Sequence, residues 1–173
     1  MAILHRATIR PSKLECLALL LGTDPAALEI RGAYRFDDPA GEVGLEGFVV
    51  ATPAGDRHAV LTYRGAPLAD VVEVTTMEHS VLGPRWIYDA GLDPVGRNVF
   101  AAALAGDLAQ AAEEIHDGDT VVGTREPSAR VAVLGTPAPG PVRVLRELRA
   151  PVEGDTGLVV SWDRGRGLAV TTG

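Results

Sequence analysis

Apolar and polar residues alternate over three consecutive stretches of this chain, and turn-forming residues separate the stretches. The alternation covers residues 28–37, 43–52 and 57–63. Asp, Pro and Gly gather in the gaps at 37–41 and 53–56, as is typical of tight connections between strands. A period of two residues indicates β-strands whose two faces differ. The pattern therefore predicts an antiparallel meander of three strands.

Two other stretches have helical spacing. Apolar residues follow residues 11–12, a Pro-Ser pair, at intervals of three and four, and Gly22 stands just past them. A second run follows the Asp-Pro pair at 93–94 and stops at Gly106. Pro and a polar residue are favoured at the start of a helix, and Gly is favoured just after its end. We therefore predict one helix in each stretch.

The rest of the chain predicts short strands and one long turn. The expected strand segments are 2–9, 71–77, 85–90, 109–116, 119–125, 129–134, 142–149, 157–163 and 167–172. The Gly- and Pro-rich composition of residues 135–141 indicates a linker or long turn. Two helices and many strands, without βαβ alternation, predict an α+β fold with antiparallel sheet. Because residues 107–173 offer few large apolar side chains for a core of their own, we expect them to form one continuous domain with residues 1–106, or two tightly packed halves.

Charge and composition exclude several classes of protein. The chain has 173 residues with 16 basic against 23 acidic residues, a net charge of −7. An acidic chain without a basic stripe is a poor match for nucleic acid. Lys13 is the only lysine, so any lysine-dependent phosphate binding would rest on it. Cys16, the single cysteine, excludes an intrachain disulfide and a cysteine-cluster zinc site, and its place among leucines predicts a small buried side chain.

No apolar run approaches the roughly 20 residues of a membrane helix. The first residues also lack the pattern of a secretory signal. We therefore expect a cytoplasmic protein that does not enter a membrane.

The densest group of polar residues is Glu78, His79 and Ser80, followed by residues 85–89. Adjacent residues of a strand point to opposite faces, so Glu78 and His79 do not converge on one atom unless the chain turns there. Neither a nucleophile elbow nor a His-Glu-x-x-His pair is present. We expect this group to be a polar turn that organises the sheet by hydrogen bonds, with no catalytic residue and no metal ligand.

The remaining histidines, His5, His58 and His116, are predicted to be ordinary surface or edge-strand residues. Aromatic residues are spaced two apart at Tyr34 and Phe36 and again at 86 and 88, which places each pair on one face of a strand. Two readings remain open for these faces: an apolar core, or a concave sheet surface that receives a ligand or a partner.

Several segments together resemble a known family. The segments are residues 2–8, 11–15, 33–44, 61–68 and 76–83. They resemble the N-terminal cap domain of actinobacterial maltokinases and, more closely, stand-alone actinobacterial proteins built on that cap, some of which carry a glucan-branching label. The resemblance covers about residues 1–106. It implies a curved antiparallel sheet packed on helices in a cystatin-like arrangement, followed here by a β-rich C-terminal part.

Kinase activity is not implied, because the kinase C-lobe, the His-x-Asp loop, the metal-binding Asp and a strand lysine for ATP are all missing from this chain. The resemblance implies a non-enzymatic, cap-like interaction or regulatory module, without a cofactor, that associates with a sugar kinase or an enzyme of α-glucan or trehalose metabolism. The alternative is a protein that binds a sugar or nucleotide, or a small enzyme, with a pocket on the concave face near Tyr63, Glu78, His79 and Trp86. The sequence leaves the oligomeric state open.

Overall fold

The computed structural model describes residues 2–5, 7–117 and 120–173. It contains the α-helices α1 (Lys13–Leu21) and α2 (Pro94–Ala105) and one 3₁₀ turn, η1 (Pro25–Ala27). The strands are β1 (Ala2–His5), β2 (Ile9–Arg10), β3 (Glu29–Asp37), β4 (Gly44–Thr52), β5 (Gly55–Arg64), β6 (Thr75–His79), β7 (Gly83–Asp89), β8 (Glu113–Asp117), β9 (Thr120–Arg125), β10 (Ala129–Leu134), β11 (Val142–Arg149), β12 (Gly157–Trp162) and β13 (Gly165–Thr172). Predominantly antiparallel sheet with two helices agrees with the predicted α+β class.

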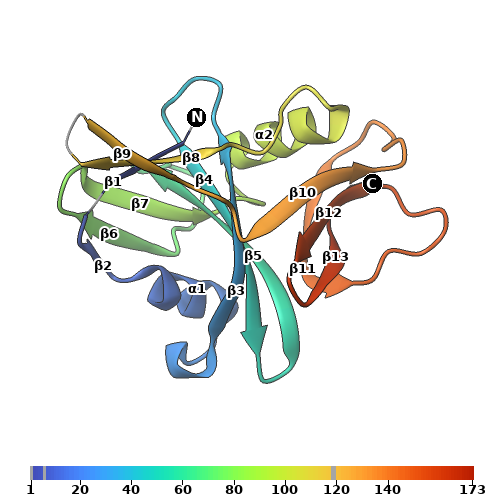
Figure 1. Ribbon diagram of the computed structural model, residues 1–173, viewed down its shortest axis with the longest axis horizontal. Helices are drawn as coiled ribbons and strands as arrows, with labels where there is room; N and C mark the ends of the chain where they lie inside the picture. The colour runs from blue at the N-terminus through green and yellow to red at the C-terminus, as the bar shows by residue number, and fades with distance from the viewer. Residues whose placement is uncertain (1, 6, 118–119) are drawn as a thin grey trace.

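The strands form a small and a large sheet (Figure 1). The small sheet has the order β1-β8-β9, and its β1–β8 pair is parallel, in contrast to the purely antiparallel arrangement that we predicted. The large sheet runs β10-β12-β13-β11-β5-β7-β6-β2, with β3 and β4 attached beside β5. All pairs of the large sheet are antiparallel.

β5 is the strand at which the large sheet branches. One edge of β5 pairs with β4 along its length, from Gly55 to Tyr63. The other edge is shared, because Arg57 pairs with Glu147 of β11 while residues 61–64 pair with β7. The C-terminal strands β10–β13 and the β6–β7 hairpin therefore diverge from opposite ends of one strand, as Figure 1 shows.

Both predicted helices are confirmed, and their ends have the expected chemistry. The Ser12 side chain accepts a hydrogen bond from the Glu15 backbone, and Glu15 binds back to the Ser12 backbone, which completes a capping box. Asp93 caps α2 in a similar way. Gly22 and Gly106 end the helices with φ of 66° and 82°, a left-handed conformation that glycine adopts without strain.

The predicted meander is also confirmed as β3, β4 and β5, but three other strand predictions were wrong in detail. Residues 2–9 do not form one strand, because β1 and β2 join different sheets. Residues 109–112 are not part of β8, and Gln110 instead bonds with its side chain to β10 backbone at Ala129 and Val131. Glu78 and His79 lie in β6, so the turn that follows begins only at Ser80.

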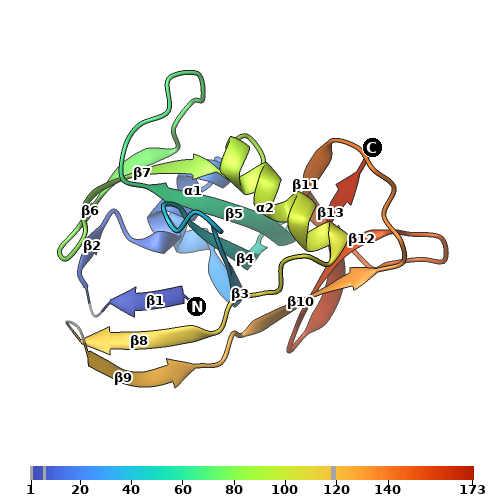
Figure 2. The same cartoon turned by 90° about the horizontal axis from the view of Figure 1, so that it is seen from above.

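The meander is buried on both faces. One face, with α1, forms an apolar cluster that includes Leu17, Phe48 and Leu61. The opposite face, with α2 and the C-terminal strands, forms another that includes Val49 and Val60. Figure 2 shows α1 and α2 on opposite sides of β5. The second cluster draws on both residues 1–106 and residues 107–173, whereas their organisation as a single domain stays a prediction.

Tyr34 and Phe36 lie in this second cluster with their rings edge to face. Of the two interpretations left open by the sequence, the apolar core is therefore the correct one for this pair. Gly47 makes room for Tyr34, because a Cβ at Gly47 would stand 2.1 Å from the tyrosine ring. Cys16 is fully buried in α1, as predicted, and burial raises the pKa of its thiol to about 11. No helix in the described part of the chain is long and apolar enough to cross a membrane.

His58 is a correction to the sequence analysis, because its side chain is fully buried rather than at the surface. Nδ1 lies 3.0 Å from the Leu145 carbonyl oxygen of β11. Since a carbonyl only accepts, Nδ1 carries the proton, and Nε2 accepts from the Tyr34 hydroxyl at 2.6 Å. A neutral histidine thus links β3, β5 and β11. Sequence spacing gave no sign of this, since β11 follows almost 90 residues later.

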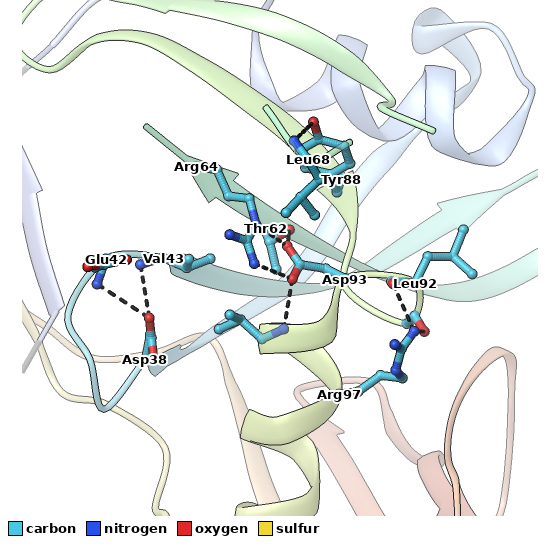
Figure 3. A network of polar contacts seen from close by, with 12 residues as sticks. Asp38, Glu42, Val43, Thr62, Arg64, Leu68, Tyr88, Leu92, Asp93 and Arg97 are labelled. Atoms are coloured by element: carbon cyan, nitrogen blue, oxygen red, sulfur yellow. Dashed lines mark hydrogen bonds and ion pairs between the residues drawn. The ribbon is translucent and has the colours of Figure 1, made fainter. Parts of the chain in front are cut away.

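A second buried polar group joins the other end of β5 to α2 (Figure 3). Asp93 is fully buried and accepts hydrogen bonds from the Thr62 hydroxyl and, at two oxygens, from the Arg64 guanidinium. The same carboxylate caps the helix through the Val95 backbone N–H. Arg64 and these other donors outweigh burial and lower the pKa of Asp93. Removing one member of such a buried pair typically costs about 3–5 kcal/mol.

The buried His58 makes stability depend on pH. Burial lowers the pKa of His58 to about 4, whereas an unfolded histidine titrates near pH 6.5. The unfolded chain therefore binds the extra proton between these values, and stability is lost as the pH falls from about 6.5 towards 4. We expect the free energy of unfolding in urea to fall by about 2 kcal/mol between pH 7.5 and pH 5 from this residue.

The matched control is His58→Asn, whose amide can hold the Leu145 carbonyl but does not titrate. Between pH 7.5 and pH 5, the free energy of unfolding of this variant should fall by about 2 kcal/mol less than that of the parent. Equal pH dependence of the two proteins would contradict a neutral, buried His58.

Candidate functional site

A cavity of the described structure lies on the face of the meander that α1 covers. It has a volume of about 410 Å³, within the usual range for small-ligand sites. We call it the Tyr63 cavity. Its walls come from the chain before α1, from α1, from β3 to β7 and from the two hairpin turns. The lining residues are Ala7, Ile9, Lys13, Arg35, Gly41, Glu42, Gly44, Glu46, Tyr63, Gly65, Met77, His79, Leu82 and Arg85.

The cavity brings together two of the four residues proposed from the sequence. Tyr63 and His79 both line it, whereas Glu78 and Trp86 do not. The pleat explains this division, because neighbours along a strand point to opposite faces. Glu78 is exposed and Trp86 half-buried on the other side of the β6–β7 hairpin. The four residues therefore do not all line this cavity.

A charged network closes the side of the cavity next to α1. The Lys13 ammonium lies 2.7–2.8 Å from both oxygens of Glu46, which is almost fully buried. The Tyr63 hydroxyl donates to the same carboxylate at 3.3 Å. Burial and the neighbouring Glu46 raise the pKa of Tyr63, so the phenol stays protonated at neutral pH. The only lysine of the chain thus neutralises a buried acid at the cavity wall.

Two arginines complete the charged lining, and sequence reasoning missed both. Arg35 comes from β3 and Arg85 from β7, and each is half-buried. Arg85 pairs with Met77, two residues before His79 on the same face, and this register of the β6–β7 hairpin comes from the structure. The register that brings Arg35 opposite Glu46 depends on the length of the β3–β4 connection, and spacing alone does not give it.

His79 stands at the mouth of the cavity. Its Nδ1 accepts hydrogen bonds from the backbone N–H groups of Val81 at 3.3 Å and Leu82 at 3.1 Å. The ring therefore holds the turn between β6 and β7, which agrees with the role in backbone hydrogen bonding that the sequence predicted. The same turn carries Leu82 into the cavity wall.

The arrangement is suited to binding. The described lining has cationic, carboxylate, phenol and imidazole groups around an apolar floor at Met77 and Ile9. Ser80 is not part of this lining, and its backbone and hydroxyl instead bind Thr8. Among the side chains that the structure describes, no group of three or more His, Cys, Asp or Glu residues is placed to hold a metal ion.

Comparison with known families identifies part of this fold. A family described as the maltokinase N-terminal cap domain matches residues 21–93. Residues 21–93 resemble the maltokinase cap. The match runs from the end of α1 to the cap of α2, so it contains the meander, the β6–β7 hairpin and most of the cavity wall. It is narrower than the range 1–106 proposed from the sequence. Neither the curated proteins nor the solved structures gave a match.

The maltokinase cap resemblance is therefore established for the centre of the chain. Lys13 lies before the matched segment, whereas Arg35, Tyr63, His79 and Arg85 lie inside it. The C-terminal strands β10–β13 lie outside it, although they pack against the same meander through the second apolar cluster.

The hydrogen bonds of His79 lead to a stability prediction. His79→Ala removes the acceptor for two backbone N–H groups, and a net loss of about 1 kcal/mol is expected for a partly exposed site. In a chain of this size that lowers the melting temperature by about 2–4 °C. Circular dichroism melts measure it, with Glu78→Ala as control, because Glu78 is exposed one residue away. An unchanged melting temperature for His79→Ala would contradict the turn-holding role.

Proposed function

We propose that this protein is a non-enzymatic, cap-like interaction or regulatory module that associates with a sugar kinase or another enzyme of α-glucan or trehalose metabolism. The observation that carries the proposal is the match of residues 21–93 to the maltokinase N-terminal cap domain. In this proposal the module acts in the cytoplasm, as a single domain whose C-terminal strands stabilise the cap-like part.

Three further observations support an associating role. The chain lacks the catalytic motifs of a kinase, so a resemblance to the cap does not bring the kinase reaction with it. The matched segment is well packed, because its meander is covered on both faces. The C-terminal strands add further cover to one of these faces, which allows a cap-like unit to fold without a kinase lobe beside it.

A capture experiment tests the proposal. The tagged, folded full chain is immobilised and exposed to lysate of the native host, and retained proteins are identified by mass spectrometry. We expect enrichment of a sugar kinase or an α-glucan enzyme. The purified partner should then bind the full chain in a direct titration, and its rate of phosphotransfer or glucan conversion should change when the module is added.

The control is the same chain immobilised after heat unfolding. It has the same composition and charge but lacks the folded surface. Retention of the same enzymes by the unfolded chain, or recovery of no enzyme of sugar metabolism, would count against the proposal.

A second candidate function is supported by the Tyr63 cavity. In that case the protein binds a small polar molecule, a sugar or nucleotide, at the cavity lined by Tyr63 and His79. A cavity of about 410 Å³ with several polar groups on an apolar floor is the usual form of a ligand site. A fluorescence thermal-shift screen with maltose, trehalose, glucosamine and nucleotides tests this function. A specific rise in melting temperature supports it, and a flat response to every compound contradicts it.

A further inference from the structure

We propose that the Tyr63 cavity is an anion site that recognises the phosphate monoester of a small polyhydroxylated molecule through Arg35 and Arg85. The inference rests on the second candidate function, the binding of a small molecule in this cavity, and names the chemical class of its ligand. It follows from the way the charges of the cavity are paired.

Arg35 lacks a partner for its guanidinium among the residues that the structure describes. Its Nε is buried without a hydrogen bond, and a buried unpaired donor is costly to keep. Glu46, the residue opposite Arg35 in the β3–β4 register, is already held by Lys13 and Tyr63. The carboxylate that would ordinarily neutralise Arg35 is therefore engaged elsewhere.

Arg85 is in a similar position. In the described part of the chain its guanidinium donates only one long hydrogen bond, at 3.4 Å, to the neighbouring Pro84 carbonyl, and no carboxylate pairs with it. Its side chain comes from β7 on the same face as Met77, so the group belongs to the cavity wall. Two half-buried guanidinium groups thus line one cavity, and neither has a carboxylate partner among the residues that the structure describes.

Two glycines let both guanidinium groups lie close against the sheet. A Cβ at Gly44 would stand 3.3 Å from Nη2 of Arg35, and a Cβ at Gly65 would stand 3.1 Å from Nη1 of Arg85. Gly44 pairs directly with Tyr63, and Gly65 lies two residues beyond it along the chain. Strand spacings are about 5 Å between neighbours and about 7 Å between alternate residues. The two guanidinium groups therefore flank Tyr63.

The charge of the cavity differs in sign from that of the whole chain. Lys13, Arg35 and Arg85 outnumber Glu42 and Glu46 in its lining, and Glu42 is exposed at the rim. The chain as a whole carries −7. A positive, partly enclosed site on an acidic protein concentrates small anions, while the surrounding negative charge opposes a polyanion such as nucleic acid.

The geometry of the side chains favours phosphate and a hydroxyl-bearing body. Arginine presents paired N–H donors that match phosphate oxygens, and two arginines can share one dianionic group. Glu46 and the Tyr63 hydroxyl beside them are suited to hydrogen bonds with sugar hydroxyls, and Met77 provides an apolar surface below. The ligand class that fits all of these groups is a sugar phosphate.

Isothermal titration calorimetry of the full chain tests the inference with glucose 6-phosphate, inorganic phosphate and glucose as probes. We expect glucose 6-phosphate to bind, inorganic phosphate to compete with it, and glucose to bind at least tenfold more weakly. Arg35→Gln and Arg85→Gln should each weaken glucose 6-phosphate binding about tenfold or more, the usual loss for a charge-assisted hydrogen bond.

The matched control is Arg164→Gln, which removes one positive charge from an exposed turn between β12 and β13. Its affinity should equal that of the parent. If circular dichroism shows that Arg35→Gln does not fold, Arg85→Gln and the charge-conserving Arg35→Lys carry the test, and Arg35→Lys should still lose affinity because the fork geometry is lost.

Equal loss of affinity in Arg164→Gln would mean general charge attraction and would overturn the inference. Binding of glucose as tight as that of its phosphate, unaffected by either arginine variant, would also overturn it while leaving the cavity a sugar site. Absence of binding by any of these probes at millimolar concentration would reject the inference, whereas the second candidate function is rejected only if the thermal-shift screen is also flat. None of these outcomes bears on capture of a partner enzyme.

Discussion

The hydrogen bonding of one strand, β5, determines how the rest of this protein is arranged. β5 pairs with β4 along one edge and divides its other edge between β11 and β7. A buried polar group stands near each end: His58 binds β11 backbone, and Thr62 and Arg64 hold Asp93 at the start of α2. Because such groups are costly when unpaired, each one fixes the position of the neighbouring segment relative to β5.

The burial of both meander faces follows from this branching. The C-terminal strands leave β5 on one side and, with α2, cover one face, whereas α1 covers part of the other. α1 has only nine residues, or about 14 Å of helix, and does not cover the whole of its face. The Tyr63 cavity lies where this cover ends, between Lys13 of the helix and the β6–β7 hairpin. The site is thus a consequence of a short helix on a long sheet.

The cap-like segment contains most of the cavity wall and six of its polar side chains, and this relates the proposed functions to one another. An interaction module and a ligand site need not be alternatives, because a ligand that binds one surface can alter association at another if the two are energetically coupled. The polar character of the wall suits recognition of a polar molecule.

The local elements follow from short stretches of the amino-acid sequence. The helix cap at Asp93, the terminal glycines and the three strands of the meander were predicted, because hydrogen bonds and backbone preferences within a few residues decide them. Of the candidate site, Tyr63 and His79 were predicted. Glu78 and Trp86 failed to join them because a neighbour in a strand lies on the opposite face, and placing either one requires the register of the hairpin.

Features that depend on contacts between distant segments become visible only in the folded protein. The parallel β1–β8 pair, the burial of His58 beneath β11, and the engagement of Glu46 by Lys13 each join residues more than 30 positions apart. The buried Arg35 Nε, which has no hydrogen bond within the described part of the chain, is of the same kind, since its environment depends on where Glu46 finds its partner. Local propensity carries no information about such contacts, because burial and charge pairing are properties of neighbours in space.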